Sequence, residues 1–506
     1  MLNINGLTQQ LKRDDIFRWL AFGLIALAVV AFYFPTLYFP PRCDQVAYLA
    51  EIANNQHPCD LIFGTFDLNR HRVYAPGDEL LFRPLLYMFL GTQQVILGHN
   101  FWAWQLVAML AHLTLVWVLL RLLCHLSGPW LGAAGAWLFA LSVTNYELVS
   151  WPHLTSYILM MTFVVLAFEQ MVFCFEEQDL TWERIQRMLI YLSVACFIYE
   201  TANIFTLLIM GVLVMSFPKM RTRSLVLSVP VVLYMFFSFY NYVYVHHVIK
   251  TISSHGTSVG AFLGSIVYVG SWWLYEGVFN GLYGYVMGLR TAFRPNEVLV
   301  FKFLDFSNVQ VVLQLIILSA FGVLAWINRQ DFFKKITPFI VLTGMLLAYV
   351  AVIVVGRYEA LGSLKQAVGI NSYYSYPFWI IVVMMAFVLI ATKSKINRYL
   401  VIIFVTASLI LGLLQGKRIY SMASDYSQRY SSTVLLVVTL DLLVKEKGNE
   451  PGFSFYVHPQ YPGNYIFREV RKANDPPYKE YSFAQLLYPQ YFRPRESAKY
   501  KLLIKN

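Results

Sequence analysis

The sequence predicts an all-α polytopic membrane protein of about 11 transmembrane helices, followed by a small α/β C-terminal domain outside the membrane. Of its 506 residues, 58% are hydrophobic and only 13% are charged, whereas soluble proteins carry about 25% charged residues. The mean hydropathy is +0.54, and the apolar stretches run unbroken for about 20 residues, as a spanning helix requires. Together these values exclude a soluble protein, a disordered chain and a β-barrel of alternating strands.

The apolar stretches define the predicted crossings. They lie at 17–39, 100–120, 129–146, 151–175, 187–201, 203–217, 224–245, 309–328, 336–356, 374–392 and 399–416. The first stretch is too long for a cleavable signal peptide and lacks a cleavage site.

Basic residues give the orientation of these crossings. Fifteen of the 39 Lys and Arg fall in short loops on one side if the N-terminus is cytoplasmic, which agrees with the positive-inside rule. Eleven crossings then place the C-terminus on the opposite side. Part of the net charge of +11 therefore reflects topology, and no nucleic-acid partner is needed to explain it.

Two domains follow from this topology, a transmembrane domain over 1–416 and a C-terminal domain over 417–506. The first contains an outer loop over 40–99, with an interfacial helix predicted at 84–98, and an outer segment over 246–308. Within that segment, residues 261–288 are rich in glycine and are interpreted as re-entrant or interfacial.

The C-terminal domain is polar and basic. An amphipathic run at 431–446 predicts a helix, and the alternating run at 453–457 predicts a strand. Its basic surface is interpreted as solvated, with anionic headgroups or acidic glycans as the alternative ligands.

The first outer loop contains the main catalytic candidate, Asp44, directly after the first crossing. A carboxylate at the membrane boundary can act as general base on an acceptor hydroxyl, although a solvated loop aspartate is the alternative. Cys43 and Cys59 share this loop, and a disulfide between them stays open.

Asp78, Glu79 and Arg83 follow later in the same loop. Two carboxylates beside an arginine can steer a phosphate or hold a divalent cation, Mg²⁺ or Mn²⁺. An exposed salt bridge is the alternative. No dedicated metal-binding spacing is present, so the metal site stays unknown.

Polar residues inside or at the ends of crossings are further candidates, because polar groups in a membrane are costly. His112 lies within a predicted helix, and Glu147 and Glu200 lie at outer boundaries. A packing role for His112 and simple contact with water for the two carboxylates are the alternatives.

Arg357 and Tyr374 form a third group near the outer ends of two crossings. Arginine suits bidentate phosphate binding, and tyrosine stacks on sugar faces. An aromatic belt at the interface explains the tyrosine equally well but does not explain the arginine. Phosphate-loop, dinucleotide-binding and zinc-protease motifs do not occur in the sequence.

The order of these residues resembles the GT-C superfamily of membrane glycosyltransferases, especially its bacterial and TMTC-like mannosyltransferase branch. The matching elements are Asp44, Phe82-Arg83-Pro84-Leu85, a helix with His112, and Phe139-Ala140-Leu141 through Glu147-Leu148-Val149-Ser150-Trp151. The chain departs from the family pattern where Asp44 is followed by Gln45, and where Val143-Thr144-Asn145 replaces the proline before the glutamate.

The resemblance implies a GT-C-like transmembrane domain in a bacterial inner membrane, with its site on the periplasmic side. It implies an inverting transfer of a sugar from a polyprenyl-phosphate donor to a hydroxyl of a glycan, lipid or protein acceptor. Asp44 carries over as the base. Arg83, Glu147, Glu200 and Arg357 carry over as cavity or phosphate contacts, with membrane lipids around the site.

Two other interpretations stay open at this point. An O-antigen polymerase or ligase would depend on outer-loop arginines more than on Asp44. A transporter, flippase or non-catalytic scaffold subunit would belong to another class, but the chain lacks the two-halves symmetry common in transporters.

Overall fold

The computed structural model describes most of the helical part of the chain. The described residues are 4–40, 82–240, 309–329, 336–357, 375–390 and 398–457, together with short segments and single positions between 62 and 501. The predictions for 261–288 and for the Cys43–Cys59 pair fall largely or wholly outside these residues.

The described chain is almost entirely helical. The helices are α1 (Ile4–Tyr33), α4 (Pro84–Leu97), α5 (Phe101–Ser127), α6 (Pro129–Ala140), α7 (Tyr146–Val149), α8 (Thr155–Glu177), α9 (Trp182–Ile198), α10 (Thr201–Ser216), α11 (Arg221–Leu225), α12 (Val229–Tyr240), α15 (Val309–Ile327), α17 (Ile336–Arg357), α19 (Ser375–Ile390) and α20 (Arg398–Lys447). Short 3₁₀ turns include η1 (Phe34–Tyr38), η3 (Val143–Asn145) and η4 (Pro152–Leu154).

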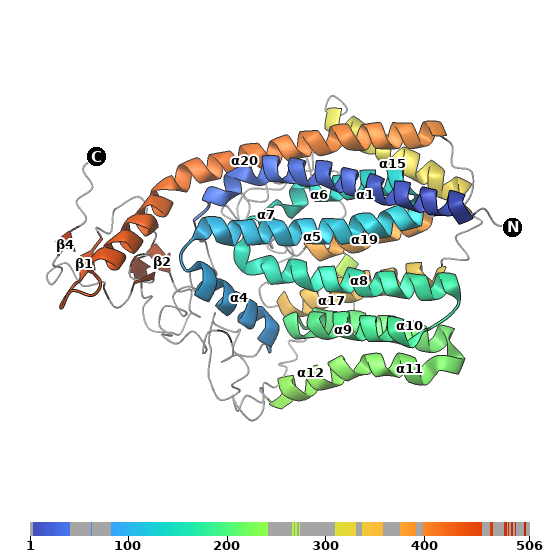
Figure 1. The fold of residues 1–506 in the computed structure, drawn as a ribbon, viewed down its shortest axis with the longest axis horizontal. Coiled ribbons are helices and arrows are strands. Elements are labelled where there is room, and N and C mark those ends of the chain that lie inside the picture. Colours follow the sequence, from blue (N-terminus) through green and yellow to red (C-terminus); the bar gives the residue numbers. More distant parts are fainter. Residues whose placement is uncertain are drawn as a thin grey trace.

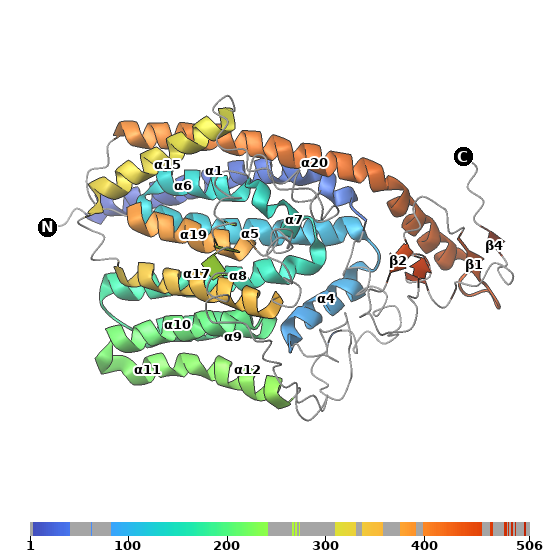
Figure 2. The ribbon, with the colours of Figure 1, turned by 180° about the vertical axis from the view of Figure 1, so that it is seen from behind.

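The long helices lie side by side in a bundle in both views (Figures 1 and 2). The N-terminus lies at one end of this bundle, and α4 and the C-terminal strands lie at the other, here called the α4 end. Six helices in the described part are long and apolar enough to cross a membrane, and α4, α10, α15 and α19 are shorter apolar helices. This is the architecture of an integral membrane protein, as the sequence predicts.

All eleven predicted crossings coincide with helices, namely α1, α5, α6, α8, α9, α10, α12, α15, α17, α19 and α20. Helix α9 fails the length and composition criterion for spanning, and α6 is only 12 residues long. The count of eleven spans therefore stays a prediction.

The outer surface of the bundle is apolar where a membrane would contact it. On α1, Leu20, Leu24 and Leu27 are 65–68% exposed, and on α12 Met235 and Phe236 are exposed by more than 60%. Exposed apolar surface on this scale is unusual for a soluble protein. Lipid is the solvent that suits it.

Small residues allow a close contact between α5 and α6. Gly128 ends α5 with a φ of +85°, and Pro129 begins α6. A Cβ on Gly132 would come within 2.3 Å of the Cys124 backbone nitrogen. The two helices therefore pack in a hairpin tighter than any larger residue allows at this position.

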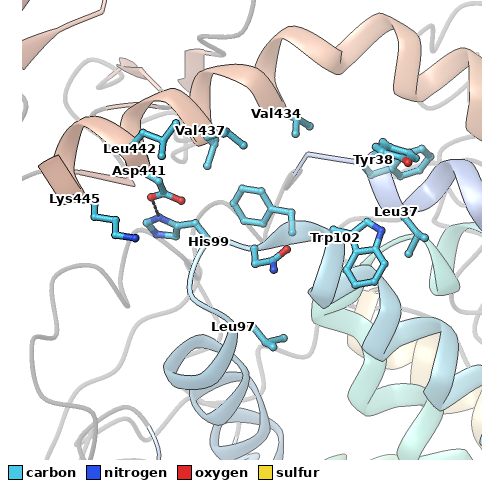
Figure 3. Close-up of a pocket in the computed structure, with 14 residues that line it drawn as sticks. Leu37, Tyr38, Leu97, His99, Trp102, Val434, Val437, Asp441, Leu442 and Lys445 are labelled. Atoms are coloured by element: carbon cyan, nitrogen blue, oxygen red, sulfur yellow. Dashed lines mark hydrogen bonds and ion pairs between the residues drawn. The ribbon is translucent and has the colours of Figure 1, made fainter.

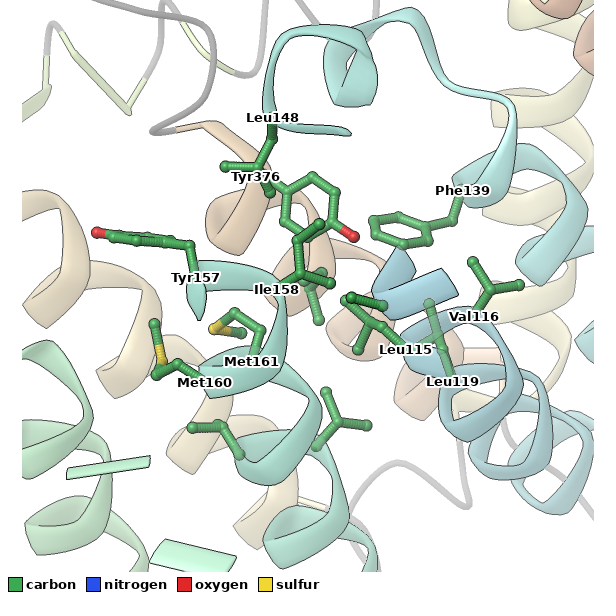
Figure 4. Close-up of a cluster of buried hydrophobic side chains, with 14 of the residues drawn as sticks. Leu115, Val116, Leu119, Phe139, Leu148, Tyr157, Ile158, Met160, Met161 and Tyr376 are labelled. Carbon is green, nitrogen blue, oxygen red and sulfur yellow. The ribbon is translucent and has the colours of Figure 1, made fainter. Parts of the chain in front are cut away.

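The core of the bundle lies between α5, α6, α8 and α19 (Figure 4). Leu115, Leu119, Ile158 and Met161 are completely buried there. Tyr376, at the start of α19, points toward Phe139 of α6, with ring centroids 5.5 Å apart. This packing holds the first turn of α19 against the last turn of α6.

Helix α20 is 50 residues long and continues past residue 416 without a break. It contains the amphipathic run predicted at 431–446, so the predicted transmembrane and C-terminal domains share this helix. A two-residue strand, β1 (Phe455–Tyr456), lies within the run expected at 453–457 and pairs in parallel with β4 (Tyr500–Lys501).

A second two-stranded sheet pairs β2 (Ile466–Arg468) with β3 (Glu480–Ser482) in antiparallel register. Helix and strand thus both occur in the C-terminal region, but a compact α/β domain stays a prediction.

Candidate active site

Arg83 and Glu200 form an ion pair at the α4 end of the bundle, although 117 residues separate them. Arg83 is the N-cap residue of α4, which Pro84 begins, and Glu200 is the N-cap residue of α10. The Nε atom of Arg83 donates to Oε2 of Glu200 at 2.8 Å, and its Nη2 atom donates to Oε1 at 2.6 Å. This fork geometry is the strong bidentate form of the arginine–carboxylate interaction.

Aromatic side chains surround the arginine. Its guanidinium lies 4.4 Å from the centroid of the Tyr199 ring, a favourable cation–π distance. Phe82, just before it, packs against Phe197 and Phe237, with ring centroids 6.4 and 6.1 Å away. These rings fix the entry to α4 against the end of α9 and the end of α12.

Electrostatics keep Arg83 charged in this partly buried position. Burial by itself would lower the pKa of Arg83, but the Glu200 carboxylate outweighs it, and the pKa rises well above its ordinary value. Two of the three guanidinium nitrogens are committed to Glu200. The geometry therefore favours a positioning role for Arg83 over direct contact with a phosphate.

Glu147 lies in the broken segment between α6 and α8, where η3, α7 and η4 replace a continuous helix. It is half-buried and occupies the first turn of α7. Asn145 fixes this segment, because its Nδ2 donates to the carbonyl of Phe139 at 2.5 Å and its side chain is fully buried. The carboxylate of Glu147 is thus carried on a rigid turn near the α4 end.

His112 is fully buried, and both of its ring nitrogens are hydrogen-bonded. The Ala140 carbonyl can only accept, so Nε2 carries the proton and donates to it at 3.1 Å. Nδ1 then accepts a hydrogen bond from the Tyr376 hydroxyl at 2.8 Å. The histidine joins α5, α6 and α19, and this geometry favours the packing alternative for His112.

The remaining predicted site residues fall outside the described side chains. Asp44, Asp78, Glu79 and Tyr374 lie outside the described residues, and Arg357 is described only as the last backbone position of α17.

One further polar cluster at the α4 end was not predicted. Nδ1 of His99 donates to Oδ1 of Asp441 at 2.9 Å, and the hydroxyl of Tyr488 also donates to Oδ1. His99 and Asp441 are 342 residues apart. No local spacing in the sequence could indicate this contact.

Within the described residues, no group of three His, Cys, Asp or Glu side chains is close enough to hold a metal ion. The two outer-loop carboxylates that could bind Mg²⁺ or Mn²⁺, Asp78 and Glu79, are not among those residues. The divalent cation therefore stays a prediction.

Comparisons with known proteins add a distant likeness of fold. No family model and no curated protein matches the chain. Among solved structures, it is similar to the oligosaccharyltransferase of Archaeoglobus fulgidus in complex with Zn and sulfate, at 14% identity and a TM-score of 0.41. The match covers 87% of this chain but only 60% of the oligosaccharyltransferase.

The archaeal oligosaccharyltransferase AglB from Archaeoglobus fulgidus, in complex with an inhibitory peptide and a dolichol-phosphate, is matched at 11% identity and a TM-score of 0.41. This match covers 87% of this chain and 62% of AglB.

ArnT from Cupriavidus metallidurans, bound to undecaprenyl phosphate, is matched at 13% identity and a TM-score of 0.34, over 72% of this chain and 76% of ArnT. AglB and ArnT are GT-C glycosyltransferases, the superfamily that the sequence motifs resemble. Because the likeness is distant, the function has to be argued from the residues of this chain.

Proposed function

We propose that this protein is an inverting glycosyltransferase that moves a sugar from a polyprenyl-phosphate donor to an acceptor hydroxyl. The reaction would take place at the α4 end of the bundle, on the periplasmic side of a bacterial inner membrane. The observation that carries the proposal is the gathering of candidate residues at this end. The Arg83–Glu200 pair, the turn with Glu147 and the helix end with Arg357 all belong to it.

In the proposed reaction, Asp44 removes the proton of the acceptor hydroxyl while the oxygen attacks the anomeric carbon of the donor. The bond between that carbon and the phosphate oxygen breaks, and its electron pair leaves with the lipid phosphate. Attack from the side opposite the phosphate inverts the anomeric centre. Asp44 then carries the proton of the acceptor.

The departing phosphate gains negative charge and requires a fixed cation nearby. Arg357 is assigned this role, because Arg83 already donates two hydrogen bonds to Glu200. Arg83 would act as a positioning residue that holds the start of α4 against the start of α10. A lipid-linked donor also agrees with the lack of a nucleotide-binding motif in the sequence.

Substitution of the proposed base tests this function. Asp44→Asn is expected to lower the rate of sugar transfer by about 10²–10⁴-fold, the usual contribution of a general base, without changing donor binding. Asp60→Asn, in the same outer loop, is the matched control and is expected to retain activity. The measurement is transfer from a radiolabelled polyprenyl-phosphate sugar in proteoliposomes, beside donor binding to the same samples.

The same assay separates the alternatives. Full transfer by Asp44→Asn together with complete loss in Arg357→Ala would favour a polymerase or ligase that depends on arginine. Movement of the labelled lipid across the bilayer without sugar transfer would favour a flippase. Either result would contradict the proposed reaction.

A further inference from the structure

A cavity of about 440 Å³ lies at the α4 end, separate from the Arg83–Glu200 pair (Figure 3). It is bounded by the end of η1, the junction between α4 and α5, and the last turns of α20. Its volume falls in the range of about 300–1,000 Å³ that is typical of sites for small ligands. We call it the α20 groove.

Helix α20 forms one wall of the groove with a single face. Its lining residues recur at helical spacing and are Val434, Val437, Val438, Asp441, Leu442 and Lys445. The facing wall is also mainly apolar and contains Leu37, Phe39, Leu97 and Phe101. The groove therefore has apolar sides and a polar end toward the C-terminus of α20.

The rim of the groove is open and amphipathic. Tyr38 and Trp102 are 50% and 47% exposed, and Leu442 is 61% exposed. Phe34, one turn before Tyr38, is also exposed and extends the apolar surface of α1 up to the rim. Tyrosine and tryptophan favour the boundary between lipid chains and headgroups, so the groove is continuous with the surface that faces lipid.

The polar end presents one anionic and one cationic group. Oδ1 of Asp441 accepts the hydrogen bonds of His99 and Tyr488, while no described residue donates to Oδ2, and the side chain is 44% exposed. Lys445 lies one helical turn further, and its ammonium points toward the groove beside His99. Within the described part of the chain, no carboxylate forms an ion pair with Lys445.

We propose that the α20 groove binds one bilayer phospholipid with a phosphoethanolamine headgroup. One acyl chain would lie along the apolar walls, the phosphate would contact Lys445, and the primary ammonium would donate a hydrogen bond to Oδ2 of Asp441. Side chains at positions i and i+4 of a helix are about 5–6 Å apart at Cβ, which suits two adjacent headgroup charges of opposite sign. The proposal does not depend on glycosyl transfer.

The charges of the groove predict a selectivity among lipids. The headgroup of phosphatidylglycerol has no cation to place beside the Asp441 carboxylate. Phosphatidylcholine carries a quaternary ammonium, which has no N–H to donate. We therefore expect the ethanolamine lipid to bind about 5–10-fold more tightly than either, a difference of about 1.0–1.4 kcal/mol.

The test is a titration of the full-length protein in detergent with the three lipids, matched in acyl chains, followed by native mass spectrometry. The expected result is a lower Kd for phosphatidylethanolamine. Equal binding of the three lipids, or a preference for phosphatidylglycerol, would overturn the proposal.

Variants locate the binding on the groove. Val438→Trp fills the groove and is expected to weaken binding of the ethanolamine lipid by at least fivefold. Leu435→Trp is the control, at an exposed position of α20 outside the groove. Lys445→Ala should weaken binding of the same lipid by about fivefold. Lys417→Ala, also at an exposed position of α20, should leave this binding unchanged.

The thermal unfolding temperature of each variant checks that it folds. If Val438→Trp does not fold, the comparison of Lys445→Ala with Lys417→Ala decides alone, because both side chains are exposed. Equal effects of a groove variant and its control would overturn the proposal.

Discussion

The ion pair of Arg83 and Glu200 makes a quantitative prediction about the stability of the α4 end. Two charge-assisted hydrogen bonds join the partners, and their side chains are only 15% and 33% exposed. Breaking a fully buried pair costs about 3–5 kcal/mol, and an exposed pair contributes about 0.2–1 kcal/mol. With Glu200 partly open to water, we expect a coupling energy of about 2 kcal/mol.

A double-mutant cycle measures this coupling. The variants are Arg83→Met, Glu200→Leu and the double variant, and the assay is reversible unfolding in mixed micelles. The control cycle uses the i,i+4 pair of Arg187 and Glu183, whose side chains are 53% and 71% exposed, with an expected coupling of about 0.3–0.5 kcal/mol. Equal coupling energies in the two cycles would refute the argument that burial strengthens the Arg83 pair.

Three further predictions concern other contacts of the described chain. His112→Phe should lower the free energy of unfolding by about 2–4 kcal/mol, because it leaves the Tyr376 hydroxyl and the Ala140 carbonyl unpaired in the core. Tyr376→Phe should lower it by only about 1 kcal/mol. Equal losses for the two variants in the same unfolding assay would contradict this. Gly132→Ala should destabilise the protein by about 1–3 kcal/mol through overpacking against α5, whereas Gly211→Ala, with open space around it, should be neutral or stabilising. Burial, and then the Asp441 carboxylate, raise the pKa of Tyr488, so the stabilisation by its hydroxyl is complete below pH of about 10 and decreases as the pH rises further. The difference in unfolding free energy between the wild type and Tyr488→Phe should therefore shrink between pH 8 and pH 11, and a constant difference would exclude this role.

The helices were predictable from the sequence, because a spanning helix leaves a local signal in its own residues. Every predicted crossing coincides with a helix, and Pro84 marks the start of α4 as its position predicts. The exact count of spans is harder to predict. Helix α9 carries charged residues in its first turns, and α6 is short. Neither helix therefore has the unbroken apolar stretch of about 20 residues that marks a spanning helix.

The contacts of the site were only partly predictable. Arg83 and Glu200 were each candidates, but their pairing depends on how α4 packs against α9 and α10, which no local pattern encodes. His112 was a candidate because polar residues in a membrane are costly, yet the same cost is offset by two hydrogen bonds inside the core. Its burial is a property of three helices together.

The length of helix α20 determines where the C-terminal strands lie. At 1.5 Å per residue its 50 residues extend about 75 Å, well beyond the 40–45 Å thickness of a bilayer with its headgroups. Its last turns therefore reach past the ends of the neighbouring helices and carry the C-terminal strands away from the bundle (Figure 1). The hydrogen bond between His99 and Asp441 ties this projecting part of α20 to the junction of α4 and α5, so the position of the C-terminal strands depends on the packing at the α4 end.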